Sequence, residues 1–87
     1  MSENSPSSEV LFQLFQGGDK EAYALLFQEF HKGLVFIIAL RLPDHPHPEE
    51  IARDSFFKAW KKRKSCANLA AFSIFLDKIT ERACDGR

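Results

Sequence analysis

The sequence predicts an all-α fold, a compact bundle of three main helices preceded by a short N-terminal helix. Apolar residues recur at three- and four-residue steps over long segments, which is typical of amphipathic helices. Most of the four Gly and four Pro among 87 residues fall outside these segments, and those at residues 17–18 and 43–48 separate one helix from the next. The length is that of a single small domain, and nine Phe supply bulky side chains for its core.

The chain is expected to begin with a disordered tail over residues 1–8, followed by one domain over residues 9–87. The tail is polar and contains Ser, Asn and Pro. A short amphipathic helix follows, and Gly17 and Gly18 should end it, with a Gly in the left-handed cap position. Its apolar face is predicted to consist of Val10, Leu11, Leu14 and Phe15.

The second helix is predicted to start after Asp19, a good N-cap residue, and to end before the Pro-rich connection at residues 43–48. From Gly33 to Leu42 nearly every residue is apolar, so this half is expected to be buried on most sides and to form the centre of the bundle. The predicted core face comprises Tyr23, Leu26, Phe27, Phe30, Leu34, Ile37, Ile38 and Leu42.

A third helix is predicted over residues 48–64. Pro48 suits the first helical position, two Glu follow in the first turn, and four basic residues end the segment, as the helix dipole favours. Its expected buried stripe is Ile51, Ala52, Ser55, Phe56, Ala59 and Trp60.

A loop at residues 65–68 leads to a fourth helix, which Asn68 is expected to cap. The residues predicted to line its core face are Leu69, Phe72, Phe75, Leu76, Ile79 and Ala83.

The charge pattern argues against strong binding to duplex DNA by this chain alone. Twelve basic and twelve acidic residues give a net charge of zero, whereas DNA-binding domains usually carry a basic excess. Lys58 and residues 61–64 nevertheless form a local basic patch, which suits a protein that a larger partner brings to DNA.

No segment has a signal-peptide layout, and the longest apolar run, residues 33–40, is too short to span a membrane. Cys66 and Cys84 have no CxxC spacing and are expected to be reduced thiols. These features predict a soluble cytoplasmic protein with no membrane partner.

The sequence contains no sign of an enzyme. There is no Ser/His/Asp order, no phosphate-binding glycine loop and no convincing acid–base pair. His45, His47 and Glu49 alternate in the Pro-rich loop without the spacing of a strong metal site. We therefore expect no metal and no cofactor.

The order of motifs resembles region 2 of the extracytoplasmic function (ECF) sigma factors. Residues 48–63, with an acidic pair followed by Phe56 to Trp60, look like region 2.2. Residues 18–27 resemble the start of region 2.1, and residues 68–84, with Phe72 and then Phe75-Leu76, are similar to regions 2.3 and 2.4. The resemblance covers about Glu9 to Arg87.

In that family the region 2.2 helix docks on the clamp coiled coil of the RNA polymerase β′ subunit. The resemblance implies that role for Glu50, Arg53, Asp54, Phe57, Lys58 and Lys61, although Arg53 replaces the usual Gln. A solvated helix face is the alternative. Promoter DNA contacts are implied for Lys62, Lys64, Ser65, Asn68, Lys78 and Arg82.

The DNA contacts also have a plain structural alternative, in which the loop only joins two helices and Asn68 only caps. On the fourth helix, Asp77 and Glu81 would oppose phosphate, and Glu81-Arg82 stands where the family commonly has Arg-Asn. A solvated, salt-bridged face is the alternative there.

Two hypotheses follow. In the first, the chain is a sigma factor domain that docks on the β′ clamp helices and recognises and melts the minus-ten promoter element, with an anti-sigma factor as a further partner. In the second, it is a sigma-like helical protein-interaction module without promoter recognition, which the zero net charge favours.

Overall fold

The computed structural model describes residues 8–85, and within them every regular element is helical, so the all-α prediction is confirmed. Residues 1–7 of the expected tail and the last two residues of the expected domain lie outside the described residues, whereas Ser8, the last residue assigned to the tail, begins α1. The elements are α1 (Ser8–Gln16), α2 (Lys20–Arg41), α3 (Pro48–Lys61), the 3-10 turn η1 (Arg63–Ser65) and α4 (Leu69–Asp85).

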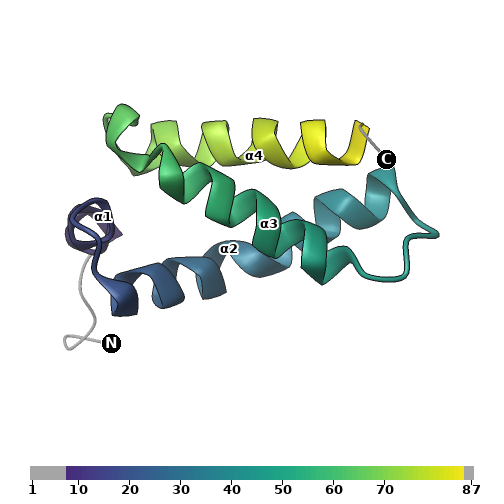
Figure 1. Cartoon of the computed structure of the whole chain (residues 1–87), viewed down its shortest axis with the longest axis horizontal. Helices are drawn as coiled ribbons and strands as arrows, with labels where there is room; N and C mark the ends of the chain where they lie inside the picture. Colours follow the sequence, from purple (N-terminus) through teal and green to yellow (C-terminus); the bar gives the residue numbers. More distant parts are fainter. Residues whose placement is uncertain (1–7, 86–87) are drawn as a thin grey trace.

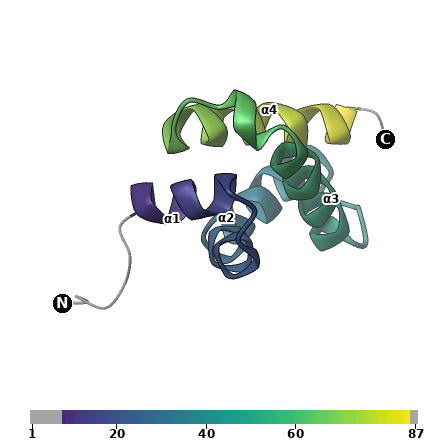
Figure 2. The same ribbon diagram turned by 60° about the vertical axis from the view of Figure 1, so that its left-hand side comes forward.

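The three long helices run in alternating directions, with α3 returning across α2 and α4 running back along the far side of α3 (Figure 1). The short helix α1 lies between the start of α2 and the start of α4 and contacts both (Figure 2). The bundle therefore has three main helices and one short one, as predicted.

Helix α1 contributes more to the core than its length suggests. Leu11, Phe12 and Phe15 are buried, whereas Val10 and Leu14, both predicted for the apolar face, are about half exposed. The predicted apolar face was therefore wrong at Val10 and Leu14. Which side of α1 is buried depends on where α2 and α4 lie, and the sequence of α1 does not determine that. Phe12 and Phe15 pack at 5.6 Å and 5.0 Å from the ring of Phe72 on α4.

The connection between α1 and α2 is formed as predicted. Gly18 has φ of +94°, a conformation that side-chain-bearing residues rarely adopt. Asp19 then caps α2, since its Oδ1 accepts a hydrogen bond of 2.9 Å from the backbone N–H of Ala22.

The centre of the core is a cluster of aromatic rings. Phe15, Phe56 and Phe72 are completely buried and come from α1, α3 and α4, with ring centroids 5.0–5.9 Å apart. Tyr23 and Phe27 of α2 add edge contacts to the Phe56 ring at 5.0 Å and 5.3 Å. Every helix thus meets at this cluster, which is why the short α1 is held in place.

The second half of α2 is not buried on most sides, which corrects the sequence prediction. Leu34 and Ile38 face the core, but Phe36 is 64% exposed and Leu40 is 68% exposed. Only one side of this half meets α3 and α4, so the other apolar side remains on the surface. Among the described residues, α2 alone is long and apolar enough to cross a membrane, a test that the core helices of soluble proteins also pass.

Helix α3 ends at Lys61, three residues earlier than predicted, and the chain tightens into η1 before α4. Its predicted stripe is confirmed, with Trp60 partly buried and the other five residues buried.

Asn68 caps the start of α4 as predicted, because its Oδ1 accepts a hydrogen bond of 2.8 Å from Ala71 N–H. On α4, Thr80 and Cys84 are also buried, although the predicted core face left them out. The buried Thr80 hydroxyl donates a hydrogen bond of 2.9 Å to the carbonyl oxygen of Leu76.

Candidate interaction surfaces on α3 and α4

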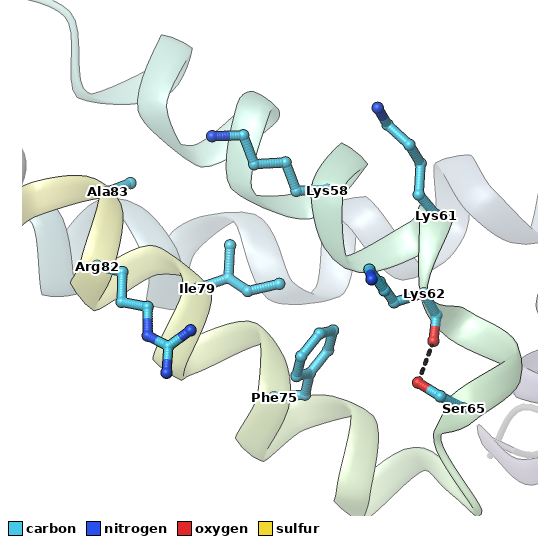
Figure 3. Close-up of a pocket in the computed structure, with 8 residues that line it drawn as sticks. All are labelled: Lys58, Lys61, Lys62, Ser65, Phe75, Ile79, Arg82 and Ala83. Atoms are coloured by element: carbon cyan, nitrogen blue, oxygen red, sulfur yellow. Dashed lines mark hydrogen bonds between the residues drawn. The ribbon is translucent and has the colours of Figure 1, made fainter.

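A groove of about 610 Å³ runs between α3 and α4 (Figure 3). Its walls come from the end of α3, the following turn and the second half of α4. The lining residues are Lys58, Lys61, Lys62, Ser65, Phe75, Ile79, Arg82 and Ala83. Five of these are among the predicted site residues, so the fold brings together side chains that stand far apart in sequence.

The groove combines a cationic edge with an apolar floor. Four of its lining residues are basic and none is acidic. Phe75 and Ile79 project from α4 toward α3 and supply the floor together with Ala83 (Figure 3). These three were predicted only as core residues. They lie at the edge of the hydrophobic stripe of α4, and only the angle at which α3 crosses α4 leaves them partly open.

The predicted DNA-contacting residues divide between the groove and its surroundings. Lys62, Ser65 and Arg82 line it, whereas Lys64 and Lys78 are exposed and are not among its lining residues. Ser65 also shapes the turn, because its hydroxyl donates a hydrogen bond of 2.7 Å to the carbonyl oxygen of Lys62 (Figure 3). Asn68 lies elsewhere, beside α1, and lines two smaller hollows there.

A second hollow, of about 360 Å³, opens between α2 and α3. It brings Arg53, Asp54 and Phe57, three of the residues predicted to bind the clamp, next to two aromatic side chains of α2. Those two, Tyr23 and Phe27, were predicted only as core residues. Burial raises the pKa of the Tyr23 hydroxyl above its usual 10.0.

Glu50, also predicted to bind the clamp, is exposed on α3 but is not among the residues of this hollow. Lys58 and Lys61, the last two of that predicted set, belong to the groove on the other side of α3. The clamp set is therefore split between two surfaces.

Two stacked aromatic rings with a cation at each end form a row along α3 and the start of η1. The Phe57 and Trp60 rings stack with centroids 6.1 Å apart and planes at 20°. The Lys61 ammonium lies 5.0 Å from the Phe57 ring centre, and the Arg63 guanidinium lies 4.1 Å from that of Trp60. Phe57 is 47% exposed, so this row offers an apolar surface with positive charge beside it.

The acidic residues of α4 are turned away from the groove. Arg41, at the end of α2, forms ion pairs with Asp85 at 3.3 Å and Glu81 at 3.7 Å. Partial burial, and then the nearby Glu81, raise the pKa of the Asp77 carboxyl above its usual 3.8. These carboxylates do not line the groove, so the opposition to phosphate expected from the sequence is weaker than charge counting suggests.

Within residues 8–85, no group of three His, Cys, Asp or Glu side chains is placed to hold a metal ion. No family model, curated protein or solved structure matches this chain.

Proposed function

We propose that this chain is a sigma factor region 2 domain of the ECF type, which docks on the β′ clamp helices of RNA polymerase and recognises and melts the minus-ten promoter element. The observation that carries the proposal is that two hollows beside α3 each bring together three of the predicted residues, although Lys58 and Lys61 of the predicted clamp set line the groove as well. Arg53, Asp54 and Phe57 share one hollow with α2 aromatics, and Lys62, Ser65 and Arg82 share the groove with α4.

The first surface has the composition of a protein-binding site. Aromatic residues and Arg dominate the energetics of protein interfaces, and a charged Arg53–Asp54 edge beside Tyr23, Phe27 and Phe57 provides both. Arg53 can donate to a carboxylate of the clamp, and Asp54 can accept from a clamp Arg.

The groove has the chemistry that single-stranded DNA requires. Its lysines and Arg82 can neutralise phosphates, while Phe75 provides a ring on which an unpaired base can stack. A surface that binds unpaired bases better than duplex shifts the equilibrium toward the open state. The zero net charge fits a domain that acts only when the polymerase holds it near the promoter.

A second candidate is a sigma-like protein-interaction module without promoter recognition. It is favoured by the zero net charge and by the acidic Asp77, Glu81 and Asp85 on α4. Under both candidates the chain is a binding protein of the cytoplasm without a cofactor, and an anti-sigma factor that covers the same helices is a further partner.

The first test is binding of this domain to the isolated β′ clamp coiled coil, measured by calorimetry. Asp54→Arg should weaken binding by about tenfold or more, because it reverses a charge inside the hollow. Glu49→Arg is the matched control, since Glu49 is exposed on the same helix and does not line the hollow. If the wild-type domain is folded but does not bind the coiled coil, the leading proposal is wrong.

The second test separates the two candidates. A fluorescent single strand carrying minus-ten sequence should bind the clamp-associated domain, and Lys62→Ala or Arg82→Ala should each lower the salt slope by about 0.7. Lys20→Ala, at the start of α2, should leave that slope unchanged. If the domain still binds the clamp and none of the groove variants changes its binding of the single strand, the second candidate, an interaction module, is the correct one.

A further inference from the structure

The outer side of α2 carries a row of exposed residues that no other described helix covers. Leu25, Glu29, Lys32, Phe36 and Leu40 follow one another at steps of four, three, four and four residues, so they share one face. Leu25 is 45% exposed, and Phe36 and Leu40 are more exposed still. Helices α1 and α4 lie above α2 in Figure 2, away from its lower edge. We call this row the α2 seam.

Two opposite charges occupy the middle of the α2 seam. The ion pairs formed among residues 8–85 join Arg41 to Glu81 and Asp85, so Glu29 and Lys32 have no ion-pair partner there. Glu29 and Lys32 lie on either side of the midpoint of Lys20–Arg41, and Leu25 and Phe36 flank that midpoint equally. The order of these four side chains is therefore self-complementary when the helix is reversed.

From this symmetry we infer that the α2 seam binds a second copy of this chain, with the two α2 helices antiparallel about a two-fold axis at their midpoints. In this register Glu29 faces Lys32 of the second copy. Because of the two-fold symmetry this ion pair forms twice, once with Glu29 from each copy. Leu25 likewise faces Phe36 of the second copy. A parallel arrangement would instead place Glu29 against Glu29 and Lys32 against Lys32.

The region beside the seam also permits close approach. A Cβ at Gly33 would meet no heavy atom within 4 Å, so nothing inside the molecule requires a glycine at this mid-helix position. A glycine there lowers helix stability but lets another backbone come near.

Lipid is a poorer occupant than a second copy. Both central charges of the seam would lose water in a hydrocarbon environment without gaining a partner, which is costly. A second copy pairs them. The inference does not depend on the proposed function, because no residue of the seam lines the groove or the α2–α3 hollow.

One helix pair buries less than the roughly 800 Å² per partner of a standard interface, so a weak dimer is expected. Sedimentation equilibrium over a wide dilution series should show a reversible monomer–dimer transition for the wild-type chain. Phe36→Glu should abolish the dimer, because it places a carboxylate in the apolar part of the seam. Circular dichroism should show that each variant is folded, because all the altered side chains are exposed.

Charge reversal tests the register. Glu29→Lys and Lys32→Glu should each raise the dimer dissociation constant by about tenfold or more, since each places like charges opposite one another. The double variant should restore wild-type affinity, and so should an equimolar mixture of the two single variants. A chain that stays monomeric at every concentration, or a dimer that these changes leave unaltered, would overturn the inference. So would reversals that weaken the dimer but are not rescued by the double variant, or a monomer that binds phosphatidylcholine vesicles through Phe36.

Discussion

Gln16 and Arg63 each hydrogen-bond to the main chain of the other. The Arg63 Nε donates to the carbonyl oxygen of Gln16 at 3.0 Å, and the Gln16 side-chain amide donates to the carbonyl oxygens of Arg63 at 3.1 Å and Cys66 at 2.8 Å. The end of α1 is thereby joined to the turn between α3 and α4. Arg63 also lies over the Trp60 ring, so within the local basic patch predicted from the sequence its guanidinium is held by contacts inside the fold.

Removing the Gln16 side chain should destabilise the domain. Gln16→Ala leaves the Cys66 carbonyl oxygen without its donor and removes one of the two donors to the Arg63 carbonyl oxygen, so we expect the free energy of unfolding to fall by about 1–2 kcal/mol. Urea unfolding followed by circular dichroism measures the loss. Lys64→Ala is the control in the same turn, where an exposed side chain should contribute less than about 0.5 kcal/mol. Equal effects of the two changes would show that the Gln16–Arg63 contact is not a stabilising one.

The aromatic cluster should dominate the stability of the core. Phe72→Ala removes a fully buried ring that contacts rings from α1 and α3, and should lower the free energy of unfolding by about 3–5 kcal/mol. Phe36→Ala makes the same chemical change at a position that is 64% exposed. In dilute solution, where the chain is monomeric, it should cost less than about 1 kcal/mol. Thermal unfolding of both variants compares them directly.

Two glycines should respond to alanine in opposite directions. Gly18→Ala forces a side chain into φ of +94° and should destabilise by about 1 kcal/mol. Gly33→Ala fills open space on a helix and should stabilise the monomer by about 0.5–1 kcal/mol. Chemical unfolding in dilute solution measures both. A stabilising Gly18→Ala would contradict the conformation of that turn.

The stability of the domain should depend on the ionisation of Asp77. Burial and Glu81 raise its pKa above 3.8 in the folded state, so the folded protein holds this proton more tightly than the unfolded chain. The tighter proton binding stabilises the folded state in full at a pH below 3.8. This contribution to the free energy of unfolding is lost as the pH rises through the raised pKa of Asp77. Asp77→Asn should therefore stabilise the domain at pH 7.

The gain should be below about 1 kcal/mol, because Asp77 is partly exposed and solvent screens the interaction. It should disappear at a pH below 3.8. Unfolding curves measured at both pH values test this, with Asp44→Asn in the exposed loop as the control. A gain that is equal at both pH values would point to a cause other than the ionisation of Asp77.

Features that depend on a few neighbouring residues could be predicted from the sequence. Asp19 and Asn68 cap their helices through hydrogen bonds that reach only three residues along the chain, and Gly18 adopts its backbone conformation within one turn. The buried stripe of α3 was also correct, because a helix with one apolar side and one charged side has a single way to face a core.

Features set by the angles between helices could not be predicted. The predicted core face of α2 correctly included Ile38 and left out Phe36, but the nearly continuous apolar run also predicted burial on most sides, and periodicity could not show how much of that run α3 and α4 would leave uncovered. For the same reason Phe75 and Ile79 read as core residues, although the crossing of α3 over α4 leaves them as the floor of a groove. The basic residues that line the groove were therefore singled out from the sequence, whereas its apolar lining residues were not.

The contact between Phe15 and Phe72 also has a consequence for biosynthesis. Helix α1 is synthesised before α4, yet the rings of Phe12 and Phe15 pack against Phe72 of α4. A nine-residue helix is marginal by itself, so its contacts with α2 and α3 should hold α1 only in part until α4 completes the ring cluster. Until then the rings of α1, α2 and α3 lack the cover of α4, and the growing chain presents an apolar surface of the kind that chaperones bind.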